Sequence, residues 1–211
     1  MKIQIWSDYA CPYCYIGERQ LQIALERTGI NEDVEIEFKA FELNPNAPKT
    51  TEFNIDQLMA SKYGLTLDQA VKTNQRIIDM AASVGLNYNF EHLKPTNTFD
   101  AHRLAHYAKT QGKLHDYVEI AMRSYFTDSK NISEYEVLLA IGVEAGLKES
   151  ETIKVLSSNV YENEVRKDES DAYARSISGV PYFIFDEKAA VYGAQPIENF
   201  MKVIESVKAQ Q

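Results

Sequence analysis

The sequence predicts an α/β fold in which two strand-containing segments flank a large block of helices. Three observations predict it: strand-like alternation near the N-terminus, helical periodicity through the middle of the chain, and a second strand signature near the C-terminus. With 211 residues, 45% of them hydrophobic, the chain can bury a substantial core.

The N-terminal segment is expected to form a strand, a helix and a second strand. Residues Lys2 to Trp6 alternate between apolar and polar side chains, and Cys11 to about Arg27 follow with helical periodicity that stops at Gly29. Residues Val34 to Phe41 alternate again, with apolar side chains on one face and charged ones on the other. A helix between two strands predicts parallel pairing with a right-handed crossover.

The middle of the chain has the start and stop signals of successive helices. Gly64 is a predicted helix stop, and two predicted capping boxes pair Thr66 with Gln69 and Ser133 with Glu136. The expected helices are 55–63, 66–85, 99–110, 114–126, 133–146, 149–157 and 161–176.

The C-terminal segment is expected to form a hairpin and a closing helix. The apolar runs 180–185 and 189–192 flank an acidic turn at Asp186 and Glu187, and an amphipathic pattern follows from Ile197 to about Val207. We therefore expect residues 1–53 and 177–211 to be the two halves of one domain, with residues 54–176 as a helical insertion.

Cys11-Pro12-Tyr13-Cys14 holds both cysteines of the chain and opens a predicted helix. If Cys11 is the N-cap, Pro12 is the first helical residue, where its fixed φ fits. The unpaired N–H groups and the helix dipole favour an anion at the cap, so Cys11 is expected to be the thiolate and Cys14 its resolving partner. Pro12 and Tyr13, the two residues between the cysteines, are expected to tune the redox potential of the pair, and Tyr13 offers no cation to Cys11.

Two other interpretations of the cysteines are less favoured. Structural cysteines seldom bracket a proline at a helix start. A zinc site would need His102 and His106, which lie much farther along the chain than the roughly 12 to 15 residues of a zinc-finger pattern, so no metal is expected. These two histidines are read instead as part of a polar helix face.

Composition excludes several classes of partner. A formal charge of −9 argues against binding nucleic acid or an anionic membrane. No stretch approaches the roughly 18 consecutive apolar residues of a membrane span, and the N-terminus lacks the apolar run of a secretory signal. We therefore expect a cytoplasmic protein, in which a Cys-x-x-Cys pair is more plausibly catalytic than structural.

The order βαβ, helical block, ββα is that of a thioredoxin fold interrupted by a large all-helical insertion. With Cys11-Pro12-Tyr13-Cys14 after the first strand and Gly179-Val180-Pro181 before a later one, the chain resembles the DsbA-like thioredoxin-fold oxidoreductases, and most closely their FrnE-like branch. The resemblance covers nearly the whole chain, including Asn97-Thr98-Phe99-Asp100-Ala101-His102 and Tyr125-Phe126.

The resemblance implies a role for several positions. Cys11 would attack and Cys14 would resolve, while Pro181 would form a cis peptide bond that leaves the N–H and C=O of Val180 free to pair with an extended substrate. Further candidates, all with structural or solvated alternatives, are residues for proton management and residues that could line a substrate cleft. The first set is Asp8, Glu37 and Lys39, and the second is Asn97, Phe99 and His102.

The leading hypothesis is a thiol–disulfide oxidoreductase that passes through a mixed disulfide on Cys11. It would need no cofactor, use glutathione or another thiol or disulfide as redox partner, and could form a homodimer. One alternative is a glutathione-dependent enzyme like the kappa-type glutathione transferases and 2-hydroxychromene-2-carboxylate isomerases, although these carry serine at the position of Cys11. The other is a ligand-binding protein with the thiols as a redox latch.

Overall fold

The computed structural model describes residues 1–30 and 34–210. The chain divides into two compact units, which we call the sheet unit (residues 1–43 and 167–211) and the helical unit (residues 44–166). Both divisions fall earlier along the chain than the boundaries after residues 53 and 176 that the sequence suggests. The second lies within helix α8 (Glu162–Ala174), because Asp168 ties the C-terminal part of this helix to the sheet.

The sheet unit contains one four-stranded mixed sheet in the order β2-β1-β3-β4. Strand β1 (Lys2–Ser7) pairs in parallel with β2 (Glu35–Ala40) and antiparallel with β3 (Tyr182–Phe185), which continues through a hairpin into β4 (Ala189–Tyr192). The hairpin turns at Asp186 and Glu187, which both have positive φ values, as a tight hairpin turn requires. The predicted βαβ and ββα segments are thus confirmed.

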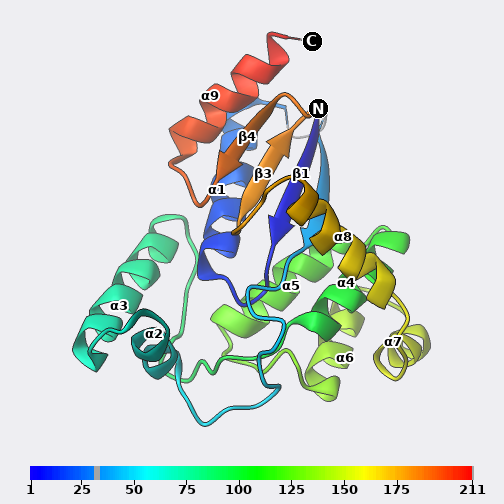
Figure 1. Ribbon diagram of the computed structural model, residues 1–211. Helices are drawn as coiled ribbons and strands as arrows, with labels where there is room; N and C mark the ends of the chain where they lie inside the picture. The colour runs from blue at the N-terminus through cyan, green and yellow to red at the C-terminus, as the bar shows by residue number, and fades with distance from the viewer. Residues whose placement is uncertain (31–33, 211) are drawn as a thin grey trace. The chain divides into compact units, whose positions relative to one another are not determined.

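Helices α1 (Pro12–Thr28) and α9 (Ile197–Lys208) pack against each other over one face of this sheet (Figure 1). Alternation along the strands supplies the apolar side chains of that face. The hydrophobic core fills the space between the sheet and these two helices. Its buried residues come from the strands, from both helices and from the position after α1: Ile3, Ile5, Leu21, Ala24, Leu25, Ile30, Phe183, Phe185, Val191, Phe200, Ile204 and Val207.

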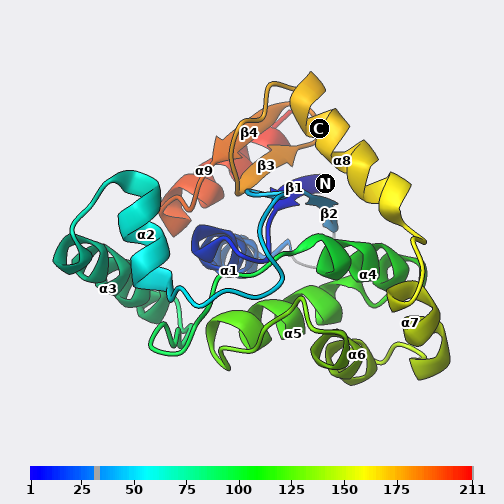
Figure 2. The ribbon, with the colours of Figure 1, turned by 60° about the horizontal axis from the view of Figure 1, so that its bottom comes forward.

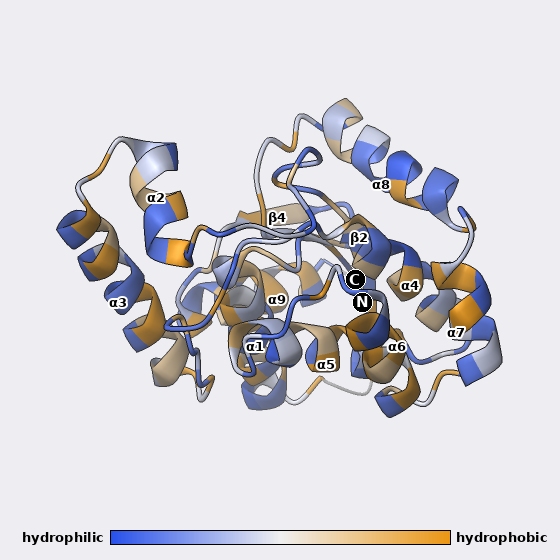
Figure 3. Cartoon of the chain, turned by 90° about the horizontal axis from the view of Figure 1, so that it is seen from below, coloured by the Kyte–Doolittle hydropathy of each residue, from blue (hydrophilic) through white to orange (hydrophobic). Residues whose placement is uncertain are grey.

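The other side of β1 and β2 meets α8. This helix is mostly hydrophilic (Figure 3), yet Asp168 is buried, and its backbone carbonyl accepts a hydrogen bond from the Trp6 indole at 3.0 Å. The charged face predicted for β2 is therefore partly covered.

The helical unit contains six further helices and the first residues of α8. Figure 2 shows α2 and α3 side by side, and α4 to α7 grouped together. Their bounds are α2 Ile55–Tyr63, α3 Leu67–Ser83, α4 Phe99–Thr110, α5 Leu114–Phe126, α6 Tyr135–Glu144 and α7 Glu149–Leu156.

The capping predictions had mixed outcomes. Thr66 and Gln69 form the predicted capping box, and Gly64 ends α2 in the left-handed conformation. The box at Ser133 was wrong: α6 begins after Glu134, and the Ser133 hydroxyl donates to the Lys49 carbonyl at 2.7 Å. A tertiary contact has replaced the local cap. Within the described ranges, no helix is both long and apolar enough to cross a membrane.

Candidate active site

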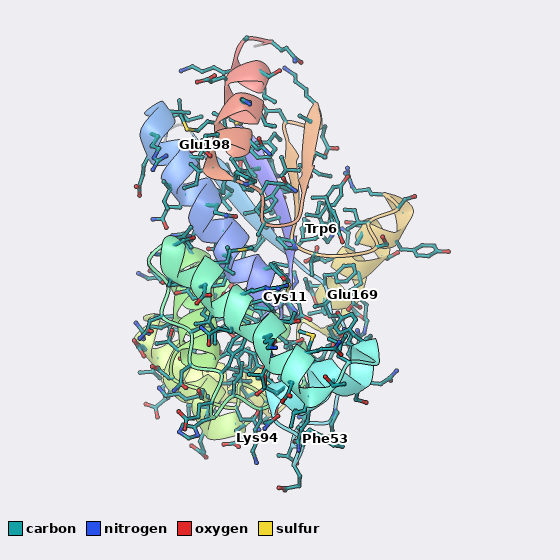
Figure 4. The ribbon with its side chains drawn as sticks, turned by 90° about the vertical axis from the view of Figure 1, so that its left-hand side faces the viewer. Trp6, Cys11, Phe53, Lys94, Glu169 and Glu198 are labelled. Carbon is teal, nitrogen blue, oxygen red and sulfur yellow. The ribbon has the colours of Figure 1, made fainter. Side chains whose placement is uncertain are left out.

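The Cys-x-x-Cys segment begins α1 as the sequence predicts. Cys11 is the N-cap, with φ −94° and ψ 111°, and Pro12 is the first helical residue. The Cys11 N–H donates to the Asp8 carbonyl at 3.0 Å, and the Cys14 N–H donates to the Cys11 carbonyl at 3.0 Å. Figure 4 shows Cys11 at this end of the helix and Trp6 on β1. The geometry places one thiol at the positive end of the helix dipole.

Both cysteines are free thiols and both are buried, Cys11 with 3% and Cys14 with 1% of its surface exposed. The Cys11 thiol donates to the Val180 carbonyl at 3.6 Å, and the Cys14 sulfur accepts the Asp8 N–H at 3.4 Å. Burial is the main reason that the pKa of the Cys14 thiol lies well above its usual value, and a hydrogen bond with Cys11 raises it further. Hydrogen bonds from the Asp8 N–H and the Ser7 hydroxyl oppose that rise.

The peptide bond between Val180 and Pro181 is cis, as the resemblance implies. The Pro181 carbonyl accepts the Gly193 N–H at 2.8 Å, which ties this segment to the residue that follows β4. The expectation that the Val180 carbonyl is free was wrong, since Cys11 occupies it. In the part of the chain that the structure describes, the Val180 N–H has no hydrogen-bond partner.

Asp8 is 1% exposed, so the alternative of a solvated charge is wrong. One carboxylate oxygen accepts the Ala10 N–H at 3.3 Å and the other accepts the Leu43 N–H at 2.7 Å. The side chain therefore fixes the loop between β1 and Cys11 and joins it to the chain beyond β2. Its role in proton management remains a prediction.

Glu37 and Lys39 are also largely covered. The Lys39 ammonium lies 3.2 Å from Glu37 and 3.2 Å from Asp168, and Glu37 also contacts Lys2 at 2.9 Å. Burial lowers the pKa of Lys39, but the charges of Asp168 and Glu37 outweigh it and the pKa is raised overall. A second Asp168 carboxylate oxygen accepts the Ala40 N–H at 3.0 Å.

Sequence reasoning missed Asp168 and Ser7. Asp168 lies in a charged stretch of α8, and the only sign that it is buried is that Val165 and Ala172, three residues before it and four after it, place apolar side chains on the same helix face. Ser7 ends β1 and reads as an ordinary strand terminus. The one sequence feature that could have marked Ser7 as a site residue is its closeness to the Cys-x-x-Cys motif.

The proposed cleft residues Asn97, Phe99 and His102 all belong to the helical unit. The side-chain Oδ1 of Asn97 accepts the Phe99 N–H at 3.0 Å, and the Arg166 guanidinium carbon lies 4.3 Å from the centroid of the Phe99 ring. His102 is 4% exposed, so its interpretation as part of a polar face was wrong. Helix initiation and packing account for these contacts, and a substrate-binding role remains a prediction.

The other half of the histidine pair is also engaged in packing. The His106 ring stacks on Tyr161 with a centroid distance of 6.5 Å. Residues 1–30 and 34–210 contain no group of three or more His, Cys, Asp or Glu side chains that could hold a metal ion.

Comparisons with known proteins agree with this fold. A search of curated proteins finds YwbO of Bacillus subtilis, itself uncharacterized, which is 28% identical over 205 residues, covering 96% of this chain and 94% of that protein. Among solved structures, a probable DsbA oxidoreductase of Streptomyces coelicolor is 33% identical, with a TM-score of 0.95, covering 100% of this chain and 91% of that one.

A more distant structure has the same fold. The cytosolic disulfide reductase DsbM of Pseudomonas aeruginosa, solved with GSH, has a TM-score of 0.69 at 14% identity, with full coverage of both chains. The family model described as the DSBA-like thioredoxin domain matches residues 2–205. With Cys11 at the N-cap of α1, Cys14 in the first turn of that helix and a cis proline at position 181, the chain belongs to the DSBA-like thioredoxin domain family.

Proposed function

We propose that this protein is a thiol–disulfide oxidoreductase that cycles Cys11 and Cys14 between dithiol and disulfide. One observation carries the proposal: Cys11 is the N-cap residue of α1, and its thiol donates to the Val180 carbonyl at 3.6 Å while Cys14 lies one turn further along the same helix. A nucleophile, a resolving thiol and a substrate-facing backbone segment are thereby brought together within the sheet unit.

The proposed reaction begins with attack of the Cys11 thiolate on a disulfide sulfur. A bond forms between Cys11 and that sulfur, the substrate disulfide breaks, and the second substrate sulfur leaves as a thiolate that takes up a proton. Cys14 then attacks the Cys11 sulfur and releases the other substrate thiolate. The enzyme is oxidised by two electrons and the substrate disulfide is reduced to two thiols; the reverse sequence oxidises a dithiol.

An extended substrate segment is proposed to pair with the backbone of Val180. Its N–H has no partner among the described residues, and its carbonyl is released when the Cys11 thiol loses its proton. An unpaired backbone donor next to a reactive sulfur suits a peptide or a glutathione-like amide. We propose glutathione as a redox partner of the protein and the cytoplasm as its compartment.

Cysteine variants test the proposal. Wild-type protein is mixed with glutathione disulfide and the products are followed by mass spectrometry. We expect exchange in the wild type, none in Cys11→Ser, and an accumulating glutathione adduct in Cys14→Ser, because the adduct on Cys11 can no longer be resolved. Exchange retained in Cys11→Ser would remove Cys11 from the mechanism.

The same variants separate the alternatives. A glutathione-dependent isomerase or transferase would turn over its substrate in the double variant that lacks both thiols. A redox-latched binding protein would show no exchange but a ligand affinity that changes on oxidation. Either outcome would contradict the proposed oxidoreductase.

A further inference from the structure

Two hydrogen-bond donors converge on the sulfur of Cys14 from the end of β1. The Asp8 N–H donates to the sulfur at 3.4 Å, and Ser7, the residue before Asp8, lowers the pKa of the Cys14 thiol through a side-chain hydrogen bond. Ser7 and Asp8 are both buried, so water does not compete freely for these donors. A buried sulfur with two donors aimed at it is in a site suited to a negative charge.

The surrounding backbone holds both donors in place. The Asp8 carboxylate accepts the N–H groups of Ala10 and Leu43, which fixes the chain on both sides of Asp8. Ser7 lies opposite Ala40 in the parallel pairing of β1 and β2, and its carbonyl accepts the Phe41 N–H at 3.2 Å. The backbone that carries both donors is therefore set before any reaction occurs, which favours electrostatic catalysis.

We propose that the Ser7 hydroxyl and the Asp8 N–H form a two-donor site that stabilises the Cys14 thiolate, with the Asp8 carboxylate as the positioning group that holds the second donor. Ser7 then acts as a catalytic residue, because its hydroxyl contacts a reacting atom. This inference rests on the proposed function and assigns a role that the cysteine motif does not itself reveal.

The site acts at the step that involves Cys14. During resolution the Cys14 thiol loses its proton and its sulfur forms a bond with the Cys11 sulfur. The bond between Cys11 and the substrate breaks, and the substrate sulfur leaves as a thiolate that takes up a proton in exchange for the one that Cys14 lost. When the enzyme instead oxidises a dithiol, Cys14 is the leaving group and departs as a thiolate. The same two donors stabilise that charge in both directions.

The burial of Cys14 explains why such donors matter. Burial and the neighbouring Cys11 raise the pKa of Cys14, so little thiolate is present at neutral pH. Nucleophilicity grows only weakly with thiol pKa, with a Brønsted coefficient of about 0.4 to 0.5. A rise in the pKa of Cys14 that lowers its thiolate fraction tenfold therefore slows resolution only about threefold, because the remaining thiolate is a better nucleophile.

The first test measures the charge on Cys14 directly. In a Cys11→Ser background, Cys14 is the remaining thiol, and its ionisation is followed by thiolate absorbance across pH. The titratable side chain of Cys11 is absent from this background, and Asp8, whose backbone N–H contacts the sulfur, is kept. We expect Ser7→Ala to move this titration to higher pH and Ser7→Thr, which keeps a hydroxyl, to restore it. An unchanged titration in Ser7→Ala would overturn the proposal.

The second test measures resolution in the two-cysteine protein. The decay of the glutathione adduct on Cys11 is expected to slow about threefold or more in Ser7→Ala, with formation of the adduct unchanged. Ser124→Ala is the matched control: Ser124 is a buried serine of the helical unit whose hydroxyl has no partner in the described chain. Equal decay rates in Ser7→Ala and Ser124→Ala would contradict the two-donor site.

Asp8→Asn separates positioning from proton transfer. The amide group of asparagine cannot accept both backbone N–H groups, so loss of positioning moves the Cys14 titration in the same direction as in Ser7→Ala. The lost negative charge acts in the opposite direction, and we expect the loss of positioning to outweigh it. If Asp8 were instead the proton acceptor, Asp8→Asn would block resolution and the titration would move to lower pH, and the assigned role would be wrong. A wild type with no exchange at all would refute the proposed function rather than this site.

Discussion

Gly17 on α1 lies directly against Pro181. A Cβ atom on Gly17 would come within 3.1 Å of the Pro181 Cγ and 3.2 Å of the Phe183 Cζ. Any side chain at this position would therefore push these neighbours away by a few tenths of an ångström. Because α1 also carries Cys14 and begins next to Cys11, this contact helps to set the distance between the reactive thiols and the Val180 backbone.

We predict that Gly17→Ala impairs exchange more than it impairs folding. Overpacking costs about 1 to 3 kcal/mol, but alanine regains roughly 1 kcal/mol of helix propensity over glycine. The free energy of unfolding should therefore fall by no more than about 2 kcal/mol. A small displacement of Val180 should still slow glutathione exchange about tenfold or more. Urea unfolding and exchange kinetics check the two effects.

Gly142→Ala is the matched control for Gly17→Ala. Gly142 also lies in a helix, α6, where a Cβ atom would come within 3.0 Å of the Thr152 methyl group. It gains the same helix propensity and meets similar crowding, but in the helical unit. We expect a change in stability with unchanged exchange. Equal loss of exchange in both variants would contradict a specific role for the contact between Gly17 and Pro181.

The sequence predicted the elements of this fold well because their signals are local. Alternation located the strands, and glycine stops and the Thr66 box located several helix ends. The failures are tertiary. The Ser133 hydroxyl prefers the carbonyl of Lys49, far away in the chain, and the charge of Asp168 is buried by contacts with β2 that no local pattern encodes.

The candidate site was predictable to a similar extent. The cysteine pair and the cis bond at Pro181 followed from a motif and a resemblance. The hydrogen bond from Cys11 to Val180 and the donors around Cys14 could not follow, because they depend on how the end of β1 meets the start of α1. Such contacts require the relative placement of strands and helix in three dimensions.

Asp168→Ala should destabilise the protein strongly. The substitution leaves the Ala40 N–H without its acceptor and removes one of two carboxylates beside the largely buried Lys39. We expect the free energy of unfolding to fall by about 2 to 3 kcal/mol, since Glu37 continues to pair with Lys39. Asp168→Asn keeps an acceptor for the Ala40 N–H and should lose less. Urea denaturation measures both.

Glu164→Ala is the control for Asp168→Ala. Glu164 is an exposed acid of the same helix, and its loss should change the free energy of unfolding by no more than about 0.5 kcal/mol. If Asp168→Ala were as mild as Glu164→Ala, the buried carboxylate would not anchor α8 to the sheet.

Asp100 should contribute to stability in a way that is lost in acid. Burial raises the pKa of Asp100, but hydrogen bonds from Lys49 and Arg103, each 2.8 Å long, lower it overall. A carboxyl group with a lowered folded-state pKa stabilises the protein above its unfolded pKa of about 3.9 and loses that contribution as the pH falls through the folded value. The free energy of unfolding of the wild type should therefore decline below about pH 4.

Asp100→Asn should flatten this acid dependence. Its free energy of unfolding is expected to be lower than that of the wild type at pH 6, with the difference shrinking at pH 3 because the wild-type carboxylate is then increasingly protonated. Urea denaturation at both pH values measures the difference. A gap between the two proteins that stays constant with pH would show that Asp100 acts only as a neutral hydrogen-bond acceptor.

Tyr13→His should make the Cys11–Cys14 disulfide more oxidising. Tyr13 lies between the cysteines with 39% of its surface exposed, so an imidazole there can be protonated and can stabilise a nearby thiolate in the reduced form. Each 1.4 kcal/mol of such stabilisation raises the reduction potential by about 30 mV. Equilibration with a glutathione buffer should show a rise in the reduction potential of roughly 15 to 60 mV at pH 6, and a smaller one at pH 8, where the imidazole is neutral.

Tyr13→Phe is the control for this substitution. It removes the hydroxyl without adding a charge, so its reduction potential should stay near that of the wild type at both pH values. Equal reduction potentials for the histidine and phenylalanine variants at pH 6 would show that a positive charge at position 13 does not stabilise the thiolate.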